Sequence, residues 1–205
     1  MLIMTKAKKP SLQRLLDLHS LINQFQEINR ILVYYKDSNR AENDVEHSYS
    51  LAMMAWYLAG FFDDLDQNTV IKIALAHDLV EVHAGDTSVF AHKDVLDAKP
   101  IKEAKAANKL KQEWPDFADM HIYIDQYKNK SNKEALFVYA LDKLMPLLFN
   151  ITQNGVTWQK HNISLKQLKA VKKGKVDKDP IVNEYYKQAC DLLEQNPQLF
   201  NSVKR

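Results

Sequence analysis

The amino-acid sequence predicts an all-α fold, formed by a single domain that spans residues 1–205 and has about seven or eight helices. Long segments repeat apolar residues every three to four positions, as the buried face of a helix does. No segment of useful length alternates apolar and polar residues, as a strand does. The 205 residues include only 4 Gly and 6 Pro, which is few for a fold rich in turns and strands. A chain of this length can form one full hydrophobic core.

Three helices are expected in the first half of the chain. The first is amphipathic, with Ser11 as its N-cap. The second is apolar nearly all round, as in a buried helix, and either Asn43 or Asp44 can cap it. The third begins as a buried apolar run and ends at Gly85, a residue that suits a helix C-terminus. These helices cover residues 11–32, 44–62 and 69–85, and a polar loop covers residues 34–43.

The second half is expected to form five more helices after a loop. Residues 86–99 have no clear period, and we interpret them as a loop that can carry a helical turn. Pro100 suits the first turn of a surface helix. Ser131 and Glu134 form a capping-box pattern before a long buried helix. The helices expected here cover residues 100–114, 116–129, 131–153, 164–174 and 180–195.

Composition and charge argue against several classes of protein. Apolar residues make up 46% and charged residues 26%, as is typical of a soluble globular protein. The net charge of +2 does not indicate a nucleic-acid or membrane partner. The lysine-rich run 166–178 lacks the interleaved aromatic residues of a nucleic-acid surface, and we interpret it as a solvated helix and turn. No apolar stretch reaches the roughly 18 residues that span a bilayer.

The compartment expected for the protein is the cytoplasm. The chain has one cysteine, Cys190, and therefore no intrachain disulfide framework, which fits a reducing compartment. Residues 1–11 lack the apolar core and the cleavage site of a signal peptide. A cytoplasmic protein without nucleic-acid or membrane partners is the expectation that follows.

Ionisable residues inside the buried helices indicate either a structural polar cluster or a functional site. His77, Asp78 and Glu81 fall within one arc of about 100° on an ideal helix, where an apolar face ends. Asp142 lies at the centre of a second apolar face, and His47 lies near the start of another buried helix. Burying such groups is costly unless they are paired or bind a metal. Taken alone, each of these residues has roughly a one-in-five chance of a functional role. Together, two histidines and two aspartates on three buried helices suit a divalent metal.

The order of these residues resembles that of the HD-domain metal-dependent phosphohydrolases. Their pattern H…HD…D is met by His47, His77–Asp78 and Asp142. The segment RAENDVEHS, which starts at Arg40, is similar to the superfamily's R-x-E-N-x-x-E-H-S segment. HDLVEVHAGDT, which starts at His77, is similar to its H-D-x-x-E-x-x-x-G-D block. The resemblance covers about residues 25–150, and helices over residues 160–200 are expected to pack on that core.

A further segment resembles one branch of this superfamily, the bacterial 5′-deoxynucleotidases. EINR at residues 27–30 is similar to the short segment that supplies a phosphate-orienting arginine in that branch, here Arg30. The branch has a tryptophan beside this arginine, and the present sequence has Ile31 instead. The resemblance to the branch therefore leaves the sugar selectivity open.

The resemblance implies a site for one divalent metal ion, held by His47, His77, Asp78 and Asp142. The sequence leaves the ion open among Mn, Co, Fe, Ni, Zn and Mg. Glu81 is expected to be the general base that orients the attacking water. The alternative is that Glu81 holds His77 in one tautomer.

The substrate contacts that the resemblance implies are Arg30, Asp86 and Thr87. Arg30 would hold the phosphate with its charged fork, and Arg40 competes for the same role. Asp86 would contact the sugar or act as a catalytic acid, with capping of the next turn as the alternative. Lys143 can reach a phosphate, although we interpret it as a solvated lysine that points away from Asp142.

The activity implied is that of a metal-dependent phosphohydrolase acting on a small phosphorylated metabolite. The first expectation is a (deoxy)nucleoside 5′-monophosphate, cleaved to nucleoside and phosphate. Two alternatives stay open. One is hydrolysis of a larger nucleotide, such as an alarmone or a cyclic dinucleotide, and the other is a non-catalytic nucleotide-binding regulatory protein. The resemblance also implies a homodimer.

Overall fold

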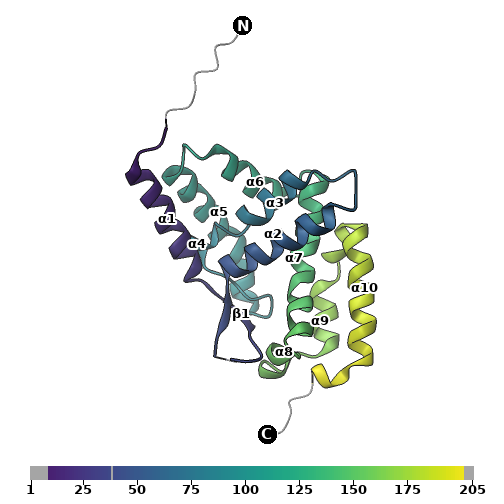
Figure 1. Ribbon diagram of the computed structural model, residues 1–205. Coiled ribbons are helices and arrows are strands. Elements are labelled where there is room, and N and C mark those ends of the chain that lie inside the picture. Colours follow the sequence, from purple (N-terminus) through teal and green to yellow (C-terminus); the bar gives the residue numbers. More distant parts are fainter. Residues whose placement is uncertain (1–8, 38, 201–205) are drawn as a thin grey trace.

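Helix α7 (Lys133–Thr152) is the central element of the core. The computed structural model describes residues 9–37 and 39–200. In this structure α2 (Asp44–Ala59), α3 (Gln67–Ala76) and α10 (Pro180–Gln195) pack around α7 (Figure 1). Side chains from all four helices are buried in one apolar cluster, which includes Leu51, Ile73, Phe137, Leu141 and Leu193.

The predicted all-α fold is confirmed, with more and shorter helices than expected. A second apolar cluster joins α1, α5 and α6 to the end of α3, through Leu21, Leu110, Ile124 and Ala76. The remaining helices are α1 (Leu12–Gln26), α4 (Glu81–Ala84), α5 (Lys93–Glu113), α6 (Ala118–Asn129), α8 (Val156–Lys160) and α9 (Leu165–Lys172). Two strands, β1 (Asn29–Val33) and β2 (Ala41–Asn43), and two 3₁₀ helices, η1 (Val176–Lys178) and η2 (Pro197–Leu199), complete the described part of the chain.

Helix α7 contains a longer apolar stretch than was expected from the sequence. By length and composition this helix alone, among the described residues, qualifies as a candidate to cross a membrane, although no stretch of that kind was expected. The reason is its place in the fold, because a helix surrounded by other helices is apolar on most of its faces. The expectation that there is no signal peptide depends on residues 1–8, which lie outside the described residues.

The first helix is shorter than the predicted range 11–32, and a β-hairpin follows it. Helix α1 begins after its N-cap Ser11 as expected, but it ends at Gln26. Strand β1 then pairs antiparallel with β2, with Val33 opposite Ala41. Its residues Ile31 and Val33 are β-branched and favour a strand, and Val33 N donates to Thr157 Oγ1 at 3.0 Å. Strands of five and three residues are too short to show an alternating pattern, and for this reason they could not be predicted.

The helix predicted over residues 69–85 is broken in the middle. Helix α3 ends at Ala76, turns follow, and α4 begins at Glu81. The break has a local cause, because His77 Nδ1 donates to Ala74 O at 2.8 Å and so takes the carbonyl that Asp78 N would use in a continuous helix. Gly85, with φ at 73°, ends α4 as predicted.

Two other helix starts differ from the prediction. Helix α5 begins at Lys93, so Pro100 lies inside it rather than near its start. The N-cap of α7 is Asn132, whose side chain accepts from Ala135 N at 2.8 Å. Glu134 does not complete the predicted box with Ser131 but accepts from Asp66 N at 3.3 Å, which joins the starts of α3 and α7.

The capping box of α2 fixes the part of the helix that carries His47. Asn43 Oδ1 accepts from Glu46 N at 2.9 Å, and Glu46 Oε2 accepts from Asn43 N at 3.2 Å. We expect Asn43→Ala to lower the free energy of unfolding by about 1 kcal/mol, because one of these bonds is lost. Asn43→Ser, which keeps a capping oxygen, should lose much less. Urea titrations of both variants measure the difference, and equal losses would contradict a capping role.

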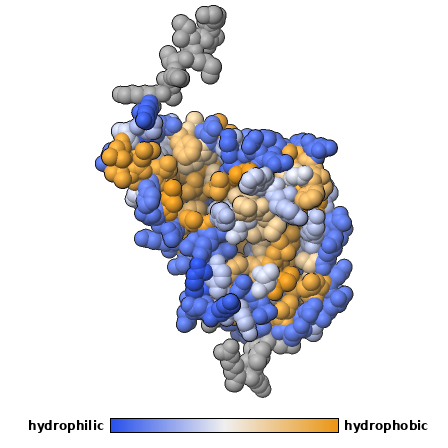
Figure 2. Space-filling view, in the orientation of Figure 1, coloured by the Kyte–Doolittle hydropathy of each residue, from blue (hydrophilic) through white to orange (hydrophobic). Residues whose placement is uncertain are grey.

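One face of α1 is apolar and uncovered by the described residues. Figure 2 shows hydrophobic side chains gathered over the N-terminal part of this helix. Leu12 is 73% exposed, and Leu15 and Leu16 are more than half exposed. The homodimer expected from the sequence stays a prediction.

Candidate metal centre

The four predicted metal ligands converge where α2, α3 and α7 meet. His47 comes from α2, His77 and Asp78 follow the end of α3, and Asp142 comes from α7. His47 Nε2 lies 3.1 Å from Asp142 Oδ1. His77 Nε2 lies 2.9 Å from Asp78 Oδ2 and 4.0 Å from Asp142 Oδ1. Two ring nitrogens and two carboxylate oxygens therefore face one small space.

The hydrogen bond of His77 determines which of its nitrogens can bind a metal. Because Nδ1 donates to Ala74 O, Nε2 carries the lone pair when the ring is neutral. This Nε2 is buried, and the polar atoms that it faces are carboxylate oxygens of Asp78 and Asp142. An imidazole nitrogen in that state, facing carboxylate oxygens, is the arrangement of a metal ligand. The residues present therefore fit a divalent ion, although they do not select one metal.

Burial and charge set the protonation of the four ligands. Burial, helped by Arg30, lowers the pKa of His47 to about 4. Burial alone would raise the pKa of Asp142, but Lys143 and the two histidines hold it well below its usual range. His77 differs, because the carboxylates of Asp78 and Asp142 outweigh burial and raise its pKa. Since a metal replaces that proton, we expect metal binding to release protons.

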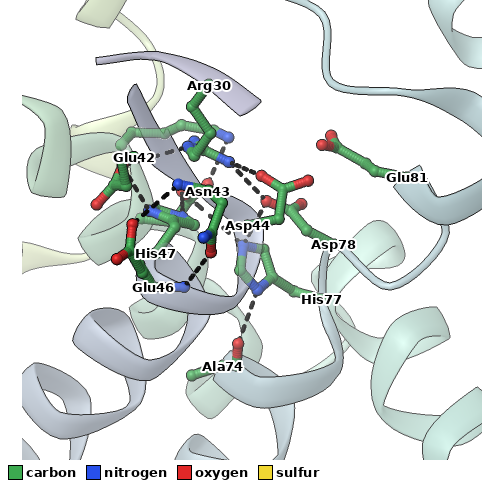
Figure 3. A network of polar contacts seen from close by, with 12 residues as sticks. Arg30, Glu42, Asn43, Asp44, Glu46, His47, Ala74, His77, Asp78 and Glu81 are labelled. Atoms are coloured by element: carbon green, nitrogen blue, oxygen red, sulfur yellow. Dashed lines mark hydrogen bonds and ion pairs between the residues drawn. The ribbon is translucent and has the colours of Figure 1, made fainter. Parts of the chain in front are cut away.

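Arg30 reaches the metal centre from β1 and is held by three carboxylates. Its Nη1 lies 3.0 Å from Asp44 Oδ1 and 3.3 Å from Asp78 Oδ2, and its Nε lies 3.5 Å from Glu42 Oε2 (Figure 3). Burial raises the pKa of Glu42 to about 7 and that of Asp44 to about 6, although Arg30 opposes both shifts. The guanidinium is thus oriented by buried acids rather than by solvent.

The structure separates the two candidate arginines. Arg30 lines the cavity beside the metal ligands, with 13% of its side chain exposed. Arg40 pairs with Glu46 and lies over the ring of Tyr34, away from that cavity.

Glu42 and Asp44 are site residues that the sequence reasoning missed. The sequence suggests only a motif position for Glu42 and a helix cap for Asp44, whereas both are buried against Arg30. The spacing carried a signal for Asp44, because it precedes His47 by three residues and so shares its face of α2.

Glu81 is a buried carboxyl group beside the ligands. It is 4% exposed, and its Oε2 makes no hydrogen bond to a described residue. Its carboxylate and those of Asp44 and Asp78 each place an oxygen within 4.8 Å of the others. Burial, together with the charges of Asp78, Asp86 and Asp44, raises the pKa of Glu81 to about 11. The tautomer of His77 is fixed by Ala74 O, so Glu81 is not needed for that purpose.

A cavity of about 110 Å³ opens beside this cluster. Asp86 and Thr87, which follow Gly85, line it with Glu81. The turn after Gly85 is bonded by Ser88, whose Oγ accepts from Phe90 N at 3.2 Å, and not by Asp86. Apolar walls complete the cavity, formed by Ile31, Leu32, Val89, Phe90, Pro146, Trp158, Ile163 and Leu168.

Two of the lysines that line this cavity, Lys143 and Lys172, are expected from the sequence to be solvated. Lys143 donates to Asp142 Oδ2, so the expectation that it points away from Asp142 is wrong. Lys172, from the lysine-rich run, is 5% exposed and lines the same cavity. The signal for Lys172 was its spacing, because it follows Leu165 and Leu168 on the apolar stripe of α9.

A helical domain that brings a histidine, a histidine–aspartate pair and a further aspartate together in this order is an HD domain. The chain belongs to this family, since the HD domain family model matches residues 22–183. It is similar to the 5′-deoxynucleotidase HDDC2 of Homo sapiens, with 28% identity over 136 residues, which are 65% of each chain. The Xenopus laevis protein of the same name is 29% identical over 136 residues, 65% of this chain and 66% of that relative. The matched region thus spans slightly less than two thirds of these curated relatives.

Solved structures agree with the family. A predicted metal-dependent phosphohydrolase from Magnetospirillum magnetotacticum superposes with a TM-score of 0.74 and 28% identity, over 90% of this chain and 95% of that one. A conserved hypothetical protein from Pyrococcus furiosus, 22% identical with a TM-score of 0.58 over 88% of this chain and 99% of that one, shows the fold alone. The predicted resemblance to HD-domain phosphohydrolases, and to their 5′-deoxynucleotidase branch, is confirmed.

Proposed function

We propose that the protein is a divalent-metal-dependent phosphohydrolase that cleaves a (deoxy)nucleoside 5′-monophosphate to nucleoside and phosphate. The observation that carries the proposal is the convergence of His47, His77, Asp78 and Asp142 beside a cavity that also holds Arg30. Similarity to proteins named 5′-deoxynucleotidase, and to a structure titled a predicted metal-dependent phosphohydrolase, supports this class of reaction.

The charged side chains of the cavity would bind and orient the phosphate. A divalent ion held by the four ligands would polarise the phosphate ester and lower the pKa of a bound water. Arg30 presents its guanidinium to the cavity and would bind phosphate oxygens through charge-assisted hydrogen bonds. Glu42 and Asp44 hold Arg30 in place behind the cavity.

Glu81 would accept the proton of the attacking water. In the metal-free protein its raised pKa keeps it protonated, because it is buried and three carboxylates surround it. Positive charge at the metal centre would lower that pKa toward the range of a working base. As water adds to phosphorus, the bond from phosphorus to the 5′ oxygen breaks, and the leaving oxygen becomes the nucleoside hydroxyl by taking up the proton that Glu81 removed from the water.

The sugar would lie against Asp86 and Thr87. Both residues line the cavity one turn beyond Glu81. There they can hydrogen bond sugar hydroxyls, or Asp86 can return a proton to the leaving oxygen. Phe90, Ile31 and Trp158 provide apolar surface for the nucleoside.

A substrate panel tests the proposed function. Protein stripped with a chelator and reloaded with Mn²⁺, Co²⁺ or Mg²⁺ should release phosphate from at least one nucleoside 5′-monophosphate, with kcat of about 1 s⁻¹ or more. Arg30→Met should lower kcat/KM by about 10- to 100-fold, because charge-assisted hydrogen bonds to the phosphate are lost. Arg40→Met is the matched control and should retain activity.

The other outcomes of this panel are equally informative. Hydrolysis of a cyclic dinucleotide or pyrophosphorylated nucleotide, with no release from any monophosphate, would contradict the proposal and favour a larger substrate. Nucleotide binding without any turnover would favour the regulatory alternative.

A cytoplasmic location and a homodimer belong to the same proposal. The location rests on the single cysteine, Cys190, which is free and buried. The dimer rests on the resemblance, and the uncovered apolar face of α1 is a surface on which two copies can pair.

A further inference from the structure

A second cavity, of about 460 Å³, also borders the metal centre and is rich in lysine. His77 and Asp78 form part of its wall. We call it the lysine cavity, because Lys99, Lys128, Lys130, Lys143 and Lys175 line it. Lys99 and Lys143 also line the first cavity, so the two cavities adjoin at these side chains.

Some lysines of the two cavities have partners within the described residues, and three do not: the exposed Lys128, and Lys172 and Lys175. Lys143 pairs with Asp142, and Lys99 Nζ lies 3.4 Å from Glu103 Oε1. Lys130 Nζ lies 4.2 Å from the ring centroid of Tyr139. The ammonium groups of Lys172, in the first cavity, and Lys175, in the lysine cavity, have no ion pair or hydrogen bond within residues 9–37 and 39–200.

Lys172 is the more unusual of the two, because it is 5% exposed. An ammonium group buried without a partner is costly, and nothing in the packing requires a charge at this position. Burial, together with Lys143, Lys175 and Arg30, lowers its pKa to about 7. Asp142 is the carboxylate that opposes this shift, and it is already bonded to Lys143. A bound anion would supply the partner that Lys172 lacks.

A tight turn places Lys172 and Lys175 beside the site. Lys172 is the last residue of α9, and Lys175 N donates to Lys172 O at 3.1 Å. Gly174 between them has φ at 76°, a conformation that glycine adopts without strain. The 3₁₀ helix η1 (Val176–Lys178) follows this turn. It packs against α7 and so holds the turn next to Lys143. Lys173 in the same turn is exposed.

We propose that Lys143, Lys172 and Lys175 form a second phosphate subsite, which binds a phosphate group other than the one that is hydrolysed. The inference rests on the proposed phosphohydrolase activity and changes the preferred substrate from a 5′-monophosphate to a nucleotide that also carries a second phosphate. A free phosphate ion has the same chemistry, and the experiment below distinguishes the two sources.

The charge of the two cavities supports a second phosphate. Seven cationic side chains line them, against five carboxylates. A divalent ion would add two positive charges, and a phosphate monoester would cancel about two. Glu42 and Asp44 offset the charge of Arg30 on its own side, so the positive excess lies at the ammonium groups of Lys172 and Lys175, where a second phosphate would neutralise it.

Selectivity between nucleotides tests the subsite. The metal-loaded protein is assayed for phosphate release from deoxyadenosine 5′-monophosphate, 3′,5′-bisphosphate and 5′-diphosphate. We expect kcat/KM for one of the doubly phosphorylated compounds to exceed that for the monophosphate by about 10-fold or more. Lys172→Met and Lys175→Met should bring this ratio toward one. Lys173→Met removes the same charge from the exposed side of the turn and should leave the ratio unchanged.

Titration calorimetry with inorganic phosphate distinguishes the sources and separates this inference from the proposed function. The subsite would be assigned to free phosphate by two results together. The ratio of kcat/KM values would lie near one, and Lys172→Met would abolish a phosphate-binding site that Lys173→Met keeps. A ratio near one, with phosphate binding equal in the two variants, would overturn the inference. If no nucleotide is hydrolysed, the proposed function fails, and the titration still decides the subsite. Thermal melts establish that each variant is folded, and Lys175→Met, at a half-buried position, keeps the test open if Lys172→Met does not fold.

Discussion

Replacing His77 with alanine is expected to abolish stoichiometric metal binding and to lower phosphate release by about a thousandfold or more. The Nε2 atom of His77 is the buried nitrogen that faces both Asp78 and Asp142. Elemental analysis of the purified variant gives the metal content, and a phosphate-release assay with the best substrate of the panel gives the activity.

The matched control for this prediction is His83→Ala. His83 lies six residues further along the chain, and its Nε2 contacts Glu113 at 2.7 Å rather than the ligand cluster. This variant should keep both metal and activity. Because ligands that bind only the folded state stabilise it, metal should raise the melting temperature of the wild type and of His83→Ala, but not of His77→Ala. Normal metal content in His77→Ala would contradict the assigned centre.

Glu81→Gln is expected to keep the metal and to lower kcat by about 10²- to 10⁴-fold, the usual contribution of a general base. Glutamine has nearly the shape of the protonated acid but cannot accept the proton of water. Glu103→Gln is a close control, because Glu103 also lies beside Lys99 but is not in the group of Asp44, Asp78 and Glu81, whose oxygens lie within 4.8 Å of one another. Loss of metal together with turnover in Glu81→Gln would show that Glu81 supports the ligands instead of acting as a base.

The same variant should make the metal-free protein more stable. The folded-state pKa of Glu81 is raised to about 11, so stability that is present below the unfolded pKa is lost as the pH rises. At pH 7 the penalty is of the order of 3 kcal/mol at most, from the difference between pH 7 and the unfolded pKa of about 4.5. Glutamine does not ionise and avoids this penalty. Urea titrations at pH 4.5 and pH 7 should show the gain only at the higher pH.

The sequence was most informative about the residues that break a local rule. His47, His77 and Asp142 each interrupt an apolar helical face, and this conflict could be read without a structure. What the sequence could not give was their separation in space, because that depends on how α2, α3 and α7 cross. The distances of 3.1 Å and 4.0 Å to Asp142 Oδ1 are products of tertiary packing.

The surroundings of the ligands were less predictable for two physical reasons. Arg30 lies on a short strand, and its placement depends on pairing with a partner more than ten residues away. Lys172 belongs to a run of six lysines in which it alone is buried, so composition concealed it. Only the position of Lys172 relative to Leu165 and Leu168 distinguishes it from its neighbours.

The bond from His77 to Ala74 explains why two neighbouring residues can serve one ion. On a continuous helix the side chains of adjacent residues diverge by about 100°, which would direct His77 and Asp78 to different sides. The bond ends the helix immediately before the pair, and the turn that follows brings His77 Nε2 and Asp78 Oδ2 to 2.9 Å from each other. The dipeptide therefore carries its own helix stop signal: the imidazole blocks the hydrogen-bond ladder with one nitrogen and offers the other to the centre. A substitution that restored the helix here would separate the pair, even with both residues retained.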